Sequence, residues 1–387
     1  MSECTKDNIV SPIGFFIPGL NGGGAQKVVV NLANALVDLT GRSVHIVVAR
    51  AEGEFLAEVR PEVEIVDLGK GRASRAIPAL ARYLRQVQPA VLCSSLNYAN
   101  VCAAVAWQLA GRPCRLVVRE DNVVLEPRGD LWSFLQSSFT QRLMRILYPR
   151  TSAVVAISNA VAGTLADRKI CPKSHIRVIG NPITVKASPE TSSVEAALPE
   201  LRDRGYICAI GRLAEQKGFD VLLRAFAQMG DEKPDLVILG EGPLRAELST
   251  LADRLGIADR VHMPGFVSAA ERVLSKASLF VLSSRWEGFG NVLVEALATG
   301  IPVVSTDCPG APRALLRDGG LGHLVPVDKP EALAEAITEA LHSPRGTRKA
   351  RQERGREFAA PAIARQYLEE AFELEATASD SKMVNEN

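Results

Sequence analysis

The sequence lacks the features of membrane-spanning, secreted and metal-binding proteins. No apolar run approaches the length of a membrane span, and the N-terminus, MSECTKDNIVSP, lacks the basic start and apolar stretch of a signal peptide. The seven cysteines are odd in number and scattered without a Cys-x-x-Cys pair, which disfavours both a disulfide framework and a zinc site. We therefore expect a reduced, cytoplasmic protein, whose contact with a membrane would be peripheral.

An excess of charge of one sign is also missing. Lys and Arg together number 45 and Asp and Glu number 44, so no overall field draws the chain onto nucleic acid. Nucleic acid is therefore not an expected partner, and any basic site must be local. At 387 residues with 47% hydrophobic content, the chain exceeds what one hydrophobic core usually supports, which predicts two domains.

Short apolar runs alternate with helical patterns in both halves, which is typical of βαβ units and parallel sheets. A segment rich in Ser, Pro and charge interrupts the alternation. The fold class predicted is α/β, with two Rossmann-like domains whose parallel sheets face a central cleft, where ligands bind beyond the strand ends. The predicted parts are an N-terminal domain at 1–184, a linker at 185–205, a C-terminal domain at 206–357, a terminal helix at 358–375 that returns to the N-terminal domain, and a disordered tail at 376–387.

Three consecutive glycines, Gly22, Gly23 and Gly24, lie between the first predicted strand and an amphipathic helix. Backbone amides and the helix dipole at such a helix start favour an anionic or polar group. A tight turn that needs positive φ accounts for one glycine of the three. The dinucleotide fingerprint is incomplete, because Lys27 stands where a third glycine is required and VHIVVAR ends without an acid. A two-domain NAD-dependent oxidoreductase is thus the disfavoured alternative.

The segment AIGRLAEQKGFD sets Arg212 and Lys217 just after an apolar run and before the next helical pattern. Two cations at the carboxyl edge of a parallel strand can neutralise a diphosphate, Arg through its planar fork and Lys as a movable point charge. A solvated loop is the alternative interpretation. A turn in VILGEGP falls at the same edge and is equally well explained by a helix with Pro243 at its first position.

Two glutamates flank a glycine-rich turn in SSRWEGFGNVLVEALATG. LFVLSS predicts a buried strand, RWEGFG the loop at its carboxyl end, and NVLVEALATG a helix whose first amides, at Gly290 and Asn291, favour phosphate. Glu287 precedes the turn, and Glu295 lies about one turn inside the helix. Since carboxylates accept hydrogen bonds from vicinal hydroxyls, these acids suit a ligand with a sugar on each side of its phosphates. An ordinary polar helix position is the alternative for Glu295.

The motifs AIGRLAEQKGFD, LGEGP, MPGF, SSRWEGFGNVLVEALATGIPVVSTDCPGAP and GHLVPV occur in this order, and through them the second half resembles glycosyltransferase family 4. GGGAQKVVVNLANAL, AISNAV and VIGNPI extend the resemblance over the first half. The resemblance implies the GT-B fold and a retaining hexosyltransferase that uses a nucleotide-sugar. It is greatest to members that transfer hexoses or N-acetylhexosamines in bacterial surface-polysaccharide and lipopolysaccharide assembly. This implies a UDP-sugar donor, a glycan or lipid-linked acceptor, and peripheral contact with the inner membrane.

The resemblance also implies roles for individual residues. Catalytic roles fall to Glu287, which would contact the transferred sugar, and to Arg212 and Lys217, which would bind the diphosphate. The residues expected to bind the donor lie in two glycine-rich turns and the helix after the second: Gly22, Gly23, Gly24, Phe289, Gly290, Asn291 and, on the ribose, Glu295. Family members often carry a histidine on the acceptor side, where this sequence has Asp121 and Asn122 as candidates, and Glu where Gln26 and Ala314 stand.

Cleavage of the bond to the anomeric carbon leaves a diphosphate with growing negative charge, which fixed cations and amides stabilise. The sequence has no Asp-x-Asp pair and no cluster of metal ligands, so we expect metal-independent transfer and no cofactor. Retention would follow from attack on the same face, with a leaving-group oxygen as base. A covalent role for Glu287 is the alternative, and a non-catalytic nucleotide-sugar-binding protein is the second interpretation of the whole chain.

The stretch 131–150 combines apolar residues with three arginines. Its apolar members are Leu131, Trp132, Phe134, Leu135, Leu143, Met144, Ile146 and Leu147, and its arginines are Arg142, Arg145 and Arg150. A basic amphipathic segment of this kind can lie on an anionic membrane and meet a lipid-linked acceptor. A helix packed on its own sheet is the alternative interpretation.

Overall fold

The computed structural model describes residues 10–21, 23–121, 131–184, 205–230, 234–267 and 270–376. Side chains between 131 and 137 are outside this description. The chain divides into two compact units, one made of Met1–Pro182 with Ala360–Asn387 and one made of Ile183–Ala359. Of the linker predicted at 185–205 and the tail predicted at 376–387, only Gly205 and Ala376 lie within the described residues.

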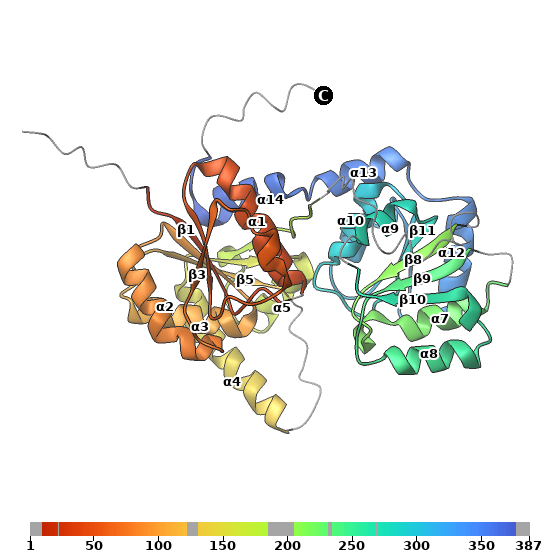
Figure 1. Cartoon of the computed structure of the whole chain (residues 1–387), viewed down its shortest axis with the longest axis horizontal. Helices are drawn as coiled ribbons and strands as arrows, with labels where there is room; N and C mark the ends of the chain where they lie inside the picture. The colour runs from red at the N-terminus through yellow and green to blue at the C-terminus, as the bar shows by residue number, and fades with distance from the viewer. Residues whose placement is uncertain are drawn as a thin grey trace, which may run out of the picture. The chain divides into compact units, whose positions relative to one another are not determined.

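The first unit is built on a parallel sheet of seven strands in the order β3-β2-β1-β4-β5-β6-β7 (Figure 1). Its strands are β1 (Ile13–Ile17), β2 (Val44–Val48), β3 (Val63–Asp67), β4 (Val91–Ser95), β5 (Arg115–Glu120), β6 (Ala153–Ala156) and β7 (Ile176–Val178). Four of these strands, β1, β2, β4 and β6, are buried at every position, as a sheet covered by helices on both faces requires.

Helices cover both faces of this sheet. They are α1 (Gly24–Thr40), η1 (Glu54–Glu58), α2 (Ala73–Val87), α3 (Asn97–Leu109), α4 (Leu131–Leu147), η2 (Tyr148–Arg150), α5 (Asn159–Asp167) and η3 (Lys173–His175). Two more come from the end of the chain, α14 (Ala360–Gln366) and the π-helix η7 (Tyr367–Phe372), and α14 packs against α1. The aromatic rings of Phe15 and Phe372 meet edge to face at 6.2 Å, so the C-terminal segment contributes to the core of this unit.

The second unit has a parallel sheet of six strands in the order β10-β9-β8-β11-β12-β13. The strands are β8 (Tyr206–Ile210), β9 (Asp235–Leu239), β10 (Val261–Gly265), β11 (Leu279–Leu282), β12 (Val303–Thr306) and β13 (His323–Val325). The helices are η5 (Glu215–Lys217), α7 (Phe219–Ala227), α8 (Arg245–Arg254), η6 (Ala258–Arg260), α9 (Ala270–Lys276), α10 (Asn291–Thr299), α11 (Pro312–Leu315), α12 (Pro330–His342) and α13 (Arg348–Arg356).

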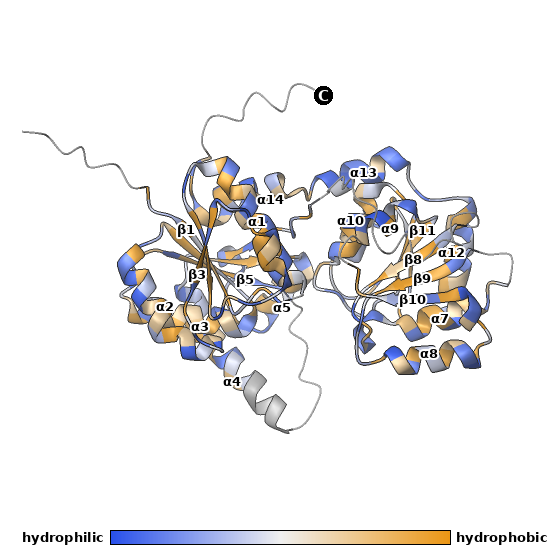
Figure 2. Cartoon of the chain, in the orientation of Figure 1, coloured by the Kyte–Doolittle hydropathy of each residue, from blue (hydrophilic) through white to orange (hydrophobic). Residues whose placement is uncertain are grey.

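The predicted α/β class, with two Rossmann-like parallel sheets, is confirmed. Figure 2 shows hydrophobic strands at the centre of each sheet and helices whose outer sides are hydrophilic. The alternative interpretation of the VILGEGP turn is wrong in one detail: Pro243 is not the first residue of a helix, since α8 begins at Arg245 after a turn. Strand β3 has no counterpart in the predicted pattern, because only part of VEIVD is buried and the run is not apolar throughout.

Close helix packing in the second unit predicts a matched pair of stability effects. Gly355 in α13 lies so close to α10 that an added Cβ would stand 2.5 Å from the backbone of Ala298, whereas a Cβ on Gly163 in α5 would meet nothing within 4 Å. We expect Gly355→Ala to destabilise the protein by about 1 to 3 kcal/mol through overpacking. Gly163→Ala should instead stabilise it by about 0.5 to 1 kcal/mol through helix propensity. Urea unfolding followed by circular dichroism compares the two, and equal behaviour would contradict the packing.

Candidate active site

The strand order of the second unit brings two loops together at one edge of its sheet. The chain runs from β8 outward to β9 and β10 and then returns to β11 on the other side of β8. This reversal falls at the carboxyl ends of β8 and β11, the position where parallel α/β sheets bind ligands. The loop after β8 carries Arg212 and Lys217, and the loop after β11 carries Glu287.

Lys217 and Glu287 form a nearly buried ion pair at this edge of the sheet. Lys217 Nζ lies 2.5 Å from Glu287 Oε1, and Ser284 Oγ donates a hydrogen bond to the same oxygen at 2.6 Å. The side chains are 17% and 7% exposed. The sequence analysis predicts that the two residues bind different parts of a ligand, whereas the structure places them in direct contact. Each charge therefore depends on the other while no ligand is bound.

The two loops are also joined through their backbones. Arg285 N donates to Gln216 O at 2.7 Å, and Ser283 Oγ donates to Lys217 O at 2.8 Å. A third segment supports Glu287 from β12, since Glu287 N donates to Pro309 O at 2.9 Å. Gly310 has φ +139, and a Cβ there would stand 2.1 Å from Glu287 O, so only glycine allows this approach. Backbone contacts thus fix the position of the Glu287 carboxylate.

The two arginines of these loops differ in what they contact. Arg285 binds the carboxylate of Asp220 at 2.8 and 3.0 Å and that of Asp328 at 2.7 Å, so its charge is used within the protein. The side chain of Arg212 is exposed and makes no hydrogen bond or ion pair with the residues that the structure describes. Arg212 is therefore a cation that a ligand can reach at the carboxyl edge of β8.

The predicted donor-binding residues of this unit lie at the start of α10. Gly290 caps the helix with φ 92, and Asn291 is its first residue. Phe289 is 5% exposed and its ring meets that of Phe358 at 5.3 Å, so it can offer a ligand only its backbone. Glu295 is half-buried one turn into the helix. The structure thus brings these four residues and Glu287 into one loop and helix start.

In the first unit, the glycine-rich turn leads directly into α1. Gly23 occupies the N-cap position and Gly24 is the first helical residue, while Gly22 lies outside the described residues. The N-terminal amides of a helix attract anions, which fits the predicted contact with phosphate. Lys27, in the first turns of α1, pairs with Glu58 and lies over the ring of Phe55, with Nζ 5.3 Å from its centroid.

A buried charged cluster lies at the carboxyl end of β5. Arg119 is 0% exposed and pairs with Asp121, and its guanidinium donates to Asn181 Oδ1 at 2.6 Å and to Ser95 Oγ at 3.4 Å. Burial raises the pKa of Asp121, although the Arg119 guanidinium opposes the shift. Asn122, the second acceptor-side candidate, lies outside the described residues. Asp121 is thus held in place by a buried cation at the edge of the sheet.

Glu120, the residue between these two, occupies the opposite face of β5. Its Oε1 accepts hydrogen bonds from Tyr148 Oη and from Asn100 Nδ2, the latter at 2.9 Å. Its other oxygen, Oε2, has no hydrogen-bond partner within the described part of the chain. Burial raises the pKa of Glu120 to about 7, and the hydrogen bonds from Tyr148 and Asn100 oppose the shift. Glu120 is therefore a carboxyl that changes charge near neutral pH.

Solved structures share this fold over nearly the whole chain. Anabaena HepE (Alr3699), solved in complex with UDP and glucose, is 21% identical, with a TM-score of 0.78 over 93% of this chain and 98% of that one. The apo lipopolysaccharide outer core galactosyltransferase WaaB is 18% identical, with a TM-score of 0.69 over 92% and 98%. At these identities the likeness establishes the fold.

Curated relatives are glycosyltransferases of glycan assembly. The Campylobacter jejuni N-acetylgalactosamine-N,N'-diacetylbacillosaminyl-diphospho-undecaprenol 4-alpha-N-acetylgalactosaminyltransferase is 28% identical over 343 residues, 85% of this chain and 90% of that protein. The lipopolysaccharide core biosynthesis glycosyltransferase LpsE of Rhizobium meliloti is 33% identical over 230 residues, 59% of this chain and 65% of that protein. The family model "Glycosyltransferase Family 4" matches residues 22–186, and "Glycosyl transferases group 1" matches residues 194–358. The chain belongs to the family 4-like glycosyltransferases of the GT-B fold.

The sequence analysis did not identify several polar residues of this glycosyltransferase that contact the predicted site residues and position them. Ser284 contacts Glu287, Arg285 joins the loops, and Arg119 holds Asp121. A signal for the last was present: RLVVRE ends an apolar strand with two charged residues, which are rarely buried unless they are paired. Within the described ranges, no three His, Cys, Asp or Glu side chains are grouped in a way that could hold a metal ion.

The predicted amphipathic stretch forms helix α4 of the glycosyltransferase, which packs against α3. Phe139 and Ile146 are 64% and 47% exposed, whereas Met144 is buried. The three arginines of the stretch, Arg142, Arg145 and Arg150, are exposed. The predicted apolar residues Leu131, Trp132, Phe134 and Leu135 lie where side chains are not described. None of the helices that the structure describes is long and apolar enough to cross a membrane.

Glu120 predicts a pH dependence of stability. Because its pKa in the folded protein, about 7, lies above the ordinary value of 4.5, ionisation costs more in the folded state than in the unfolded one. The stability of the wild type should therefore fall as pH rises from about 5 to 8, by up to roughly 3 kcal/mol. Glu120→Gln, whose amide oxygen can accept both hydrogen bonds, should lack this loss. Urea unfolding at several pH values, with the exposed Glu369→Gln as control, measures it; parallel profiles for wild type and Glu120→Gln would refute the assignment.

Proposed function

We propose that this glycosyltransferase transfers a hexose or N-acetylhexosamine from a UDP-sugar, with retention of anomeric configuration, to a lipid-linked glycan acceptor in surface-polysaccharide or lipopolysaccharide assembly. UDP is the nucleotide bound in the structure of HepE, one of the structural neighbours. The name of the Campylobacter jejuni relative, which matches most of this chain, includes a diphospho-undecaprenol acceptor. Both assignments are carried to this chain as proposals.

The Lys217–Glu287 pair beside the exposed Arg212 is the observation that carries the proposal. A buried ion pair contributes little net stability, because desolvation offsets the attraction between the charges. A pair of this kind can instead serve a ligand whose own groups bind the two buried charges. A diphosphate would bind Arg212 and Lys217, and a sugar hydroxyl would donate to Glu287 Oε2, which makes no hydrogen bond with the described residues.

The same cations would stabilise the leaving group. As the bond from the anomeric carbon to the diphosphate breaks, negative charge grows on oxygens beside Arg212, Lys217 and the N-terminus of α10, and loss of one such fixed donor typically costs about 3 kcal/mol. This supply of positive charge supports metal-independent transfer. Glu295 would bind the ribose, the turn at Gly23 and Gly24 would donate amides to the donor phosphate, and a leaving-group oxygen would accept the proton of the attacking hydroxyl.

The acceptor would be positioned by Asp121. Asp121 directly follows β5 and its carboxylate is paired with Arg119, so it can orient an acceptor hydroxyl without changing conformation. A fixed carboxylate of this kind is a reasonable substitute for the histidine that family members often carry at this place.

The assay that tests the proposal supplies UDP-linked hexoses and N-acetylhexosamines with undecaprenyl diphosphate-linked sugars and follows the product by mass spectrometry. The anomeric configuration of the new bond is read by nuclear magnetic resonance. Retained configuration and activity in excess EDTA are expected. An inverted product would exclude the retaining mechanism, loss of activity in EDTA would exclude the metal-free one, and binding of UDP-sugars without any turnover would favour a non-catalytic binding protein.

Substitutions in the ion pair predict linked effects on activity and stability. Lys217→Met should lower kcat/KM by about 100-fold or more, because a donor to the leaving group is lost. It should also lower stability by about 3 kcal/mol, since Glu287 is left buried without its cation. Adding Glu287→Gln to Lys217→Met should restore part of the stability but none of the activity. Thermal unfolding and steady-state kinetics give both quantities.

Lys349→Met serves as the matched control, because the Lys349 side chain is 85% exposed. It should change neither quantity. If the double variant lost as much stability as the sum of the two single variants, the pair would not be coupled, and the buried contact would have no part in the site.

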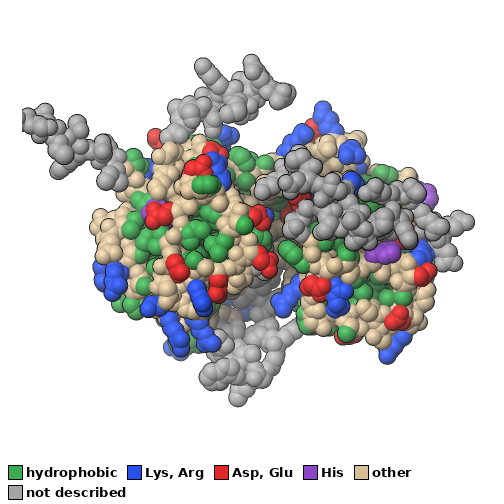
Figure 3. Space-filling view, viewed as in Figure 1, with side chains coloured by type: hydrophobic (Ala, Val, Ile, Leu, Met, Phe, Trp, Pro, Cys, Tyr) green, Lys and Arg blue, Asp and Glu red, His purple; other side chains and the backbone are tan. Residues whose placement is uncertain are grey.

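A basic face of the first unit supports contact with an anionic membrane. Helices α2, α3 and α4 pack side by side, and the sequence has no Asp or Glu between Leu68 and Arg119 or between Leu131 and Ala166. Figure 3 shows Lys and Arg side chains gathered over α2 and α3, at the lower left of the view. Exposed Phe139 and Ile146 on α4 can enter the headgroup region while the arginines contact phosphates.

Changing Arg142, Arg145 and Arg150 together to Glu should release the protein from vesicles that contain anionic lipid. Each basic residue near such a surface contributes about 1 kcal/mol, so the loss should exceed 100-fold in partition coefficient. The control changes Arg254, Lys349 and Arg356 of the second unit to Glu, which alters the net charge equally. Co-sedimentation with liposomes measures binding, and equal binding of both triple variants would eliminate α4 as the contact.

A further inference from the structure

A segment between β2 and β3 lies across the start of α1 and the turn that precedes it. We call residues 50–62 the strap. Its first part pairs with the loop after β1: Arg50 N donates to Pro18 O at 3.2 Å, Leu20 N donates to Glu52 O at 2.9 Å, and Phe55 N donates to Leu20 O at 3.1 Å. These three bonds fix the backbone that leads into the glycine-rich turn.

Gly53 is the point of closest approach between the strap and this loop. Its φ is +125, and an added Cβ would stand 2.1 Å from the carbonyl carbon of Leu20 and 2.2 Å from the nitrogen of Asn21. No side chain fits there without displacing the loop. Gly69, which follows β3 in the same unit, also has positive φ (+65), but a Cβ there would meet nothing within 4 Å. Gly69 therefore has positive φ without a close approach, whereas Gly53 combines a close approach with a backbone conformation that is essentially restricted to glycine.

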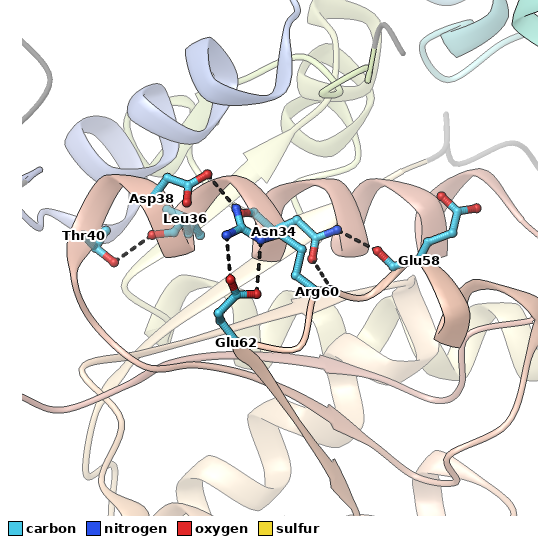
Figure 4. Close-up of polar contacts among 7 residues, drawn as sticks. All are labelled: Asn34, Leu36, Asp38, Thr40, Glu58, Arg60 and Glu62. Carbon is cyan, nitrogen blue, oxygen red and sulfur yellow. Dashed lines mark hydrogen bonds and ion pairs between the residues drawn. The ribbon is translucent and has the colours of Figure 1, made fainter. Parts of the chain in front are cut away.

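The second part of the strap is fixed along the length of α1 (Figure 4). Asn34 Nδ2 donates to Glu58 O at 2.8 Å, and Asn34 Oδ1 accepts from Arg60 N at 3.0 Å. The Arg60 guanidinium then binds Asp38 at 2.7 Å and Glu62 at 3.0 Å. Exposed ion pairs are individually weak, but here they flank the two part-buried hydrogen bonds that the Asn34 side chain makes with the strap backbone.

The side chain of Glu58, in the same part of the strap, pairs with Lys27 near the start of α1. This lysine lies in the first turns of α1, close to the glycine-rich turn, and its ammonium pairs with Glu58 above the ring of Phe55. The strap therefore contacts the helix beside its phosphate-binding end as well as near its C-terminal end.

We propose that the strap holds the glycine-rich turn in the conformation that receives the donor diphosphate, and that Gly53 and Glu58 are positioning residues for transfer. The inference rests on the proposed function of that turn. Consecutive glycines sample many backbone conformations, so a turn built from them loses entropy when it orders around a phosphate. A strap that restricts the preceding backbone removes part of this cost before the ligand binds.

The first test compares Gly53→Ala with Gly69→Ala in the full-length protein. Gly53→Ala should increase hydrogen exchange of the amides in residues 18–27 and lower kcat/KM for the UDP-sugar by about 100-fold, as misplacement of a binding group by about 1 Å does. The KM for the acceptor should stay unchanged. Gly69→Ala should leave exchange and kinetics as in the wild type. Equal effects of the two substitutions would overturn the proposal.

A second pair of variants keeps the test valid if Gly53→Ala does not fold. Glu58→Gln removes the charge that binds Lys27 and should raise the KM for the UDP-sugar several-fold, with faster exchange in residues 18–27. Asp38→Asn removes one strap contact near the other end of α1 and should change neither, since Arg60 keeps Glu62 and Asn34. Unchanged exchange and KM in Glu58→Gln would contradict the role of this residue.

Hydrogen exchange and donor kinetics together distinguish a failure of the strap proposal from a failure of the proposed function. Faster exchange in Gly53→Ala without any change in the kinetics for the donor would show that the strap orders a turn that does not serve the donor, which overturns the proposal. A wild type that neither binds nor turns over any nucleotide-sugar would instead refute the proposed function itself. Loss of donor kinetics together with faster exchange, in Gly53→Ala and not in Gly69→Ala, is the supporting result.

Discussion

The candidate site depends on one constraint, the adjacency of β8 and β11 in a parallel sheet. The chain leaves β8, completes two further strands and returns beside it, so residues about 70 positions apart meet at one sheet edge. Lys217 and Glu287 can be buried there because each neutralises the other and because Ser284 and the backbone of the β12 loop hold the carboxylate. Without the second charge, the first would stay buried without a counter-charge, which is the costly state for an ionised group.

Much of the fold could be predicted because its strands are short, apolar and separated by helices of amphipathic pattern. YICAI and LVIL are buried almost throughout, which is the signal of a parallel strand covered on both faces. β3 was not predicted because an edge strand has one partner and needs little apolar surface: VEIVD combines two acids with Val and Ile. The start of α8 was misplaced because Pro243 fits a turn as well as a first helical position.

The site could be predicted only in part, for a different reason. Arg212, Lys217 and Glu287 were found because each follows a recognisable strand, but strand order is set by tertiary packing and is not written in local periodicity. The direct contact of Lys217 with Glu287 therefore could not be anticipated. The ion pairs of Arg285 with Asp220 and Asp328 could not be anticipated either. Sequence patterns identified which loops carry charge, and packing decided which charges a ligand can still reach.

Tertiary packing, and not a local sequence pattern, also explains why the C-terminal segment returns to the first unit. Arg119 is wholly buried, and a buried guanidinium requires polar groups on every side that water would otherwise occupy. Ser95 and Asn181 supply two of them from strand ends, Asp121 supplies the counter-charge, and Tyr367 on η7 interacts with Arg119 from the last helix of the chain. The final segment thus completes the surroundings of a buried cation as well as the hydrophobic core. The Asp121 carboxylate is therefore held through Arg119 by residues that are far apart in the sequence.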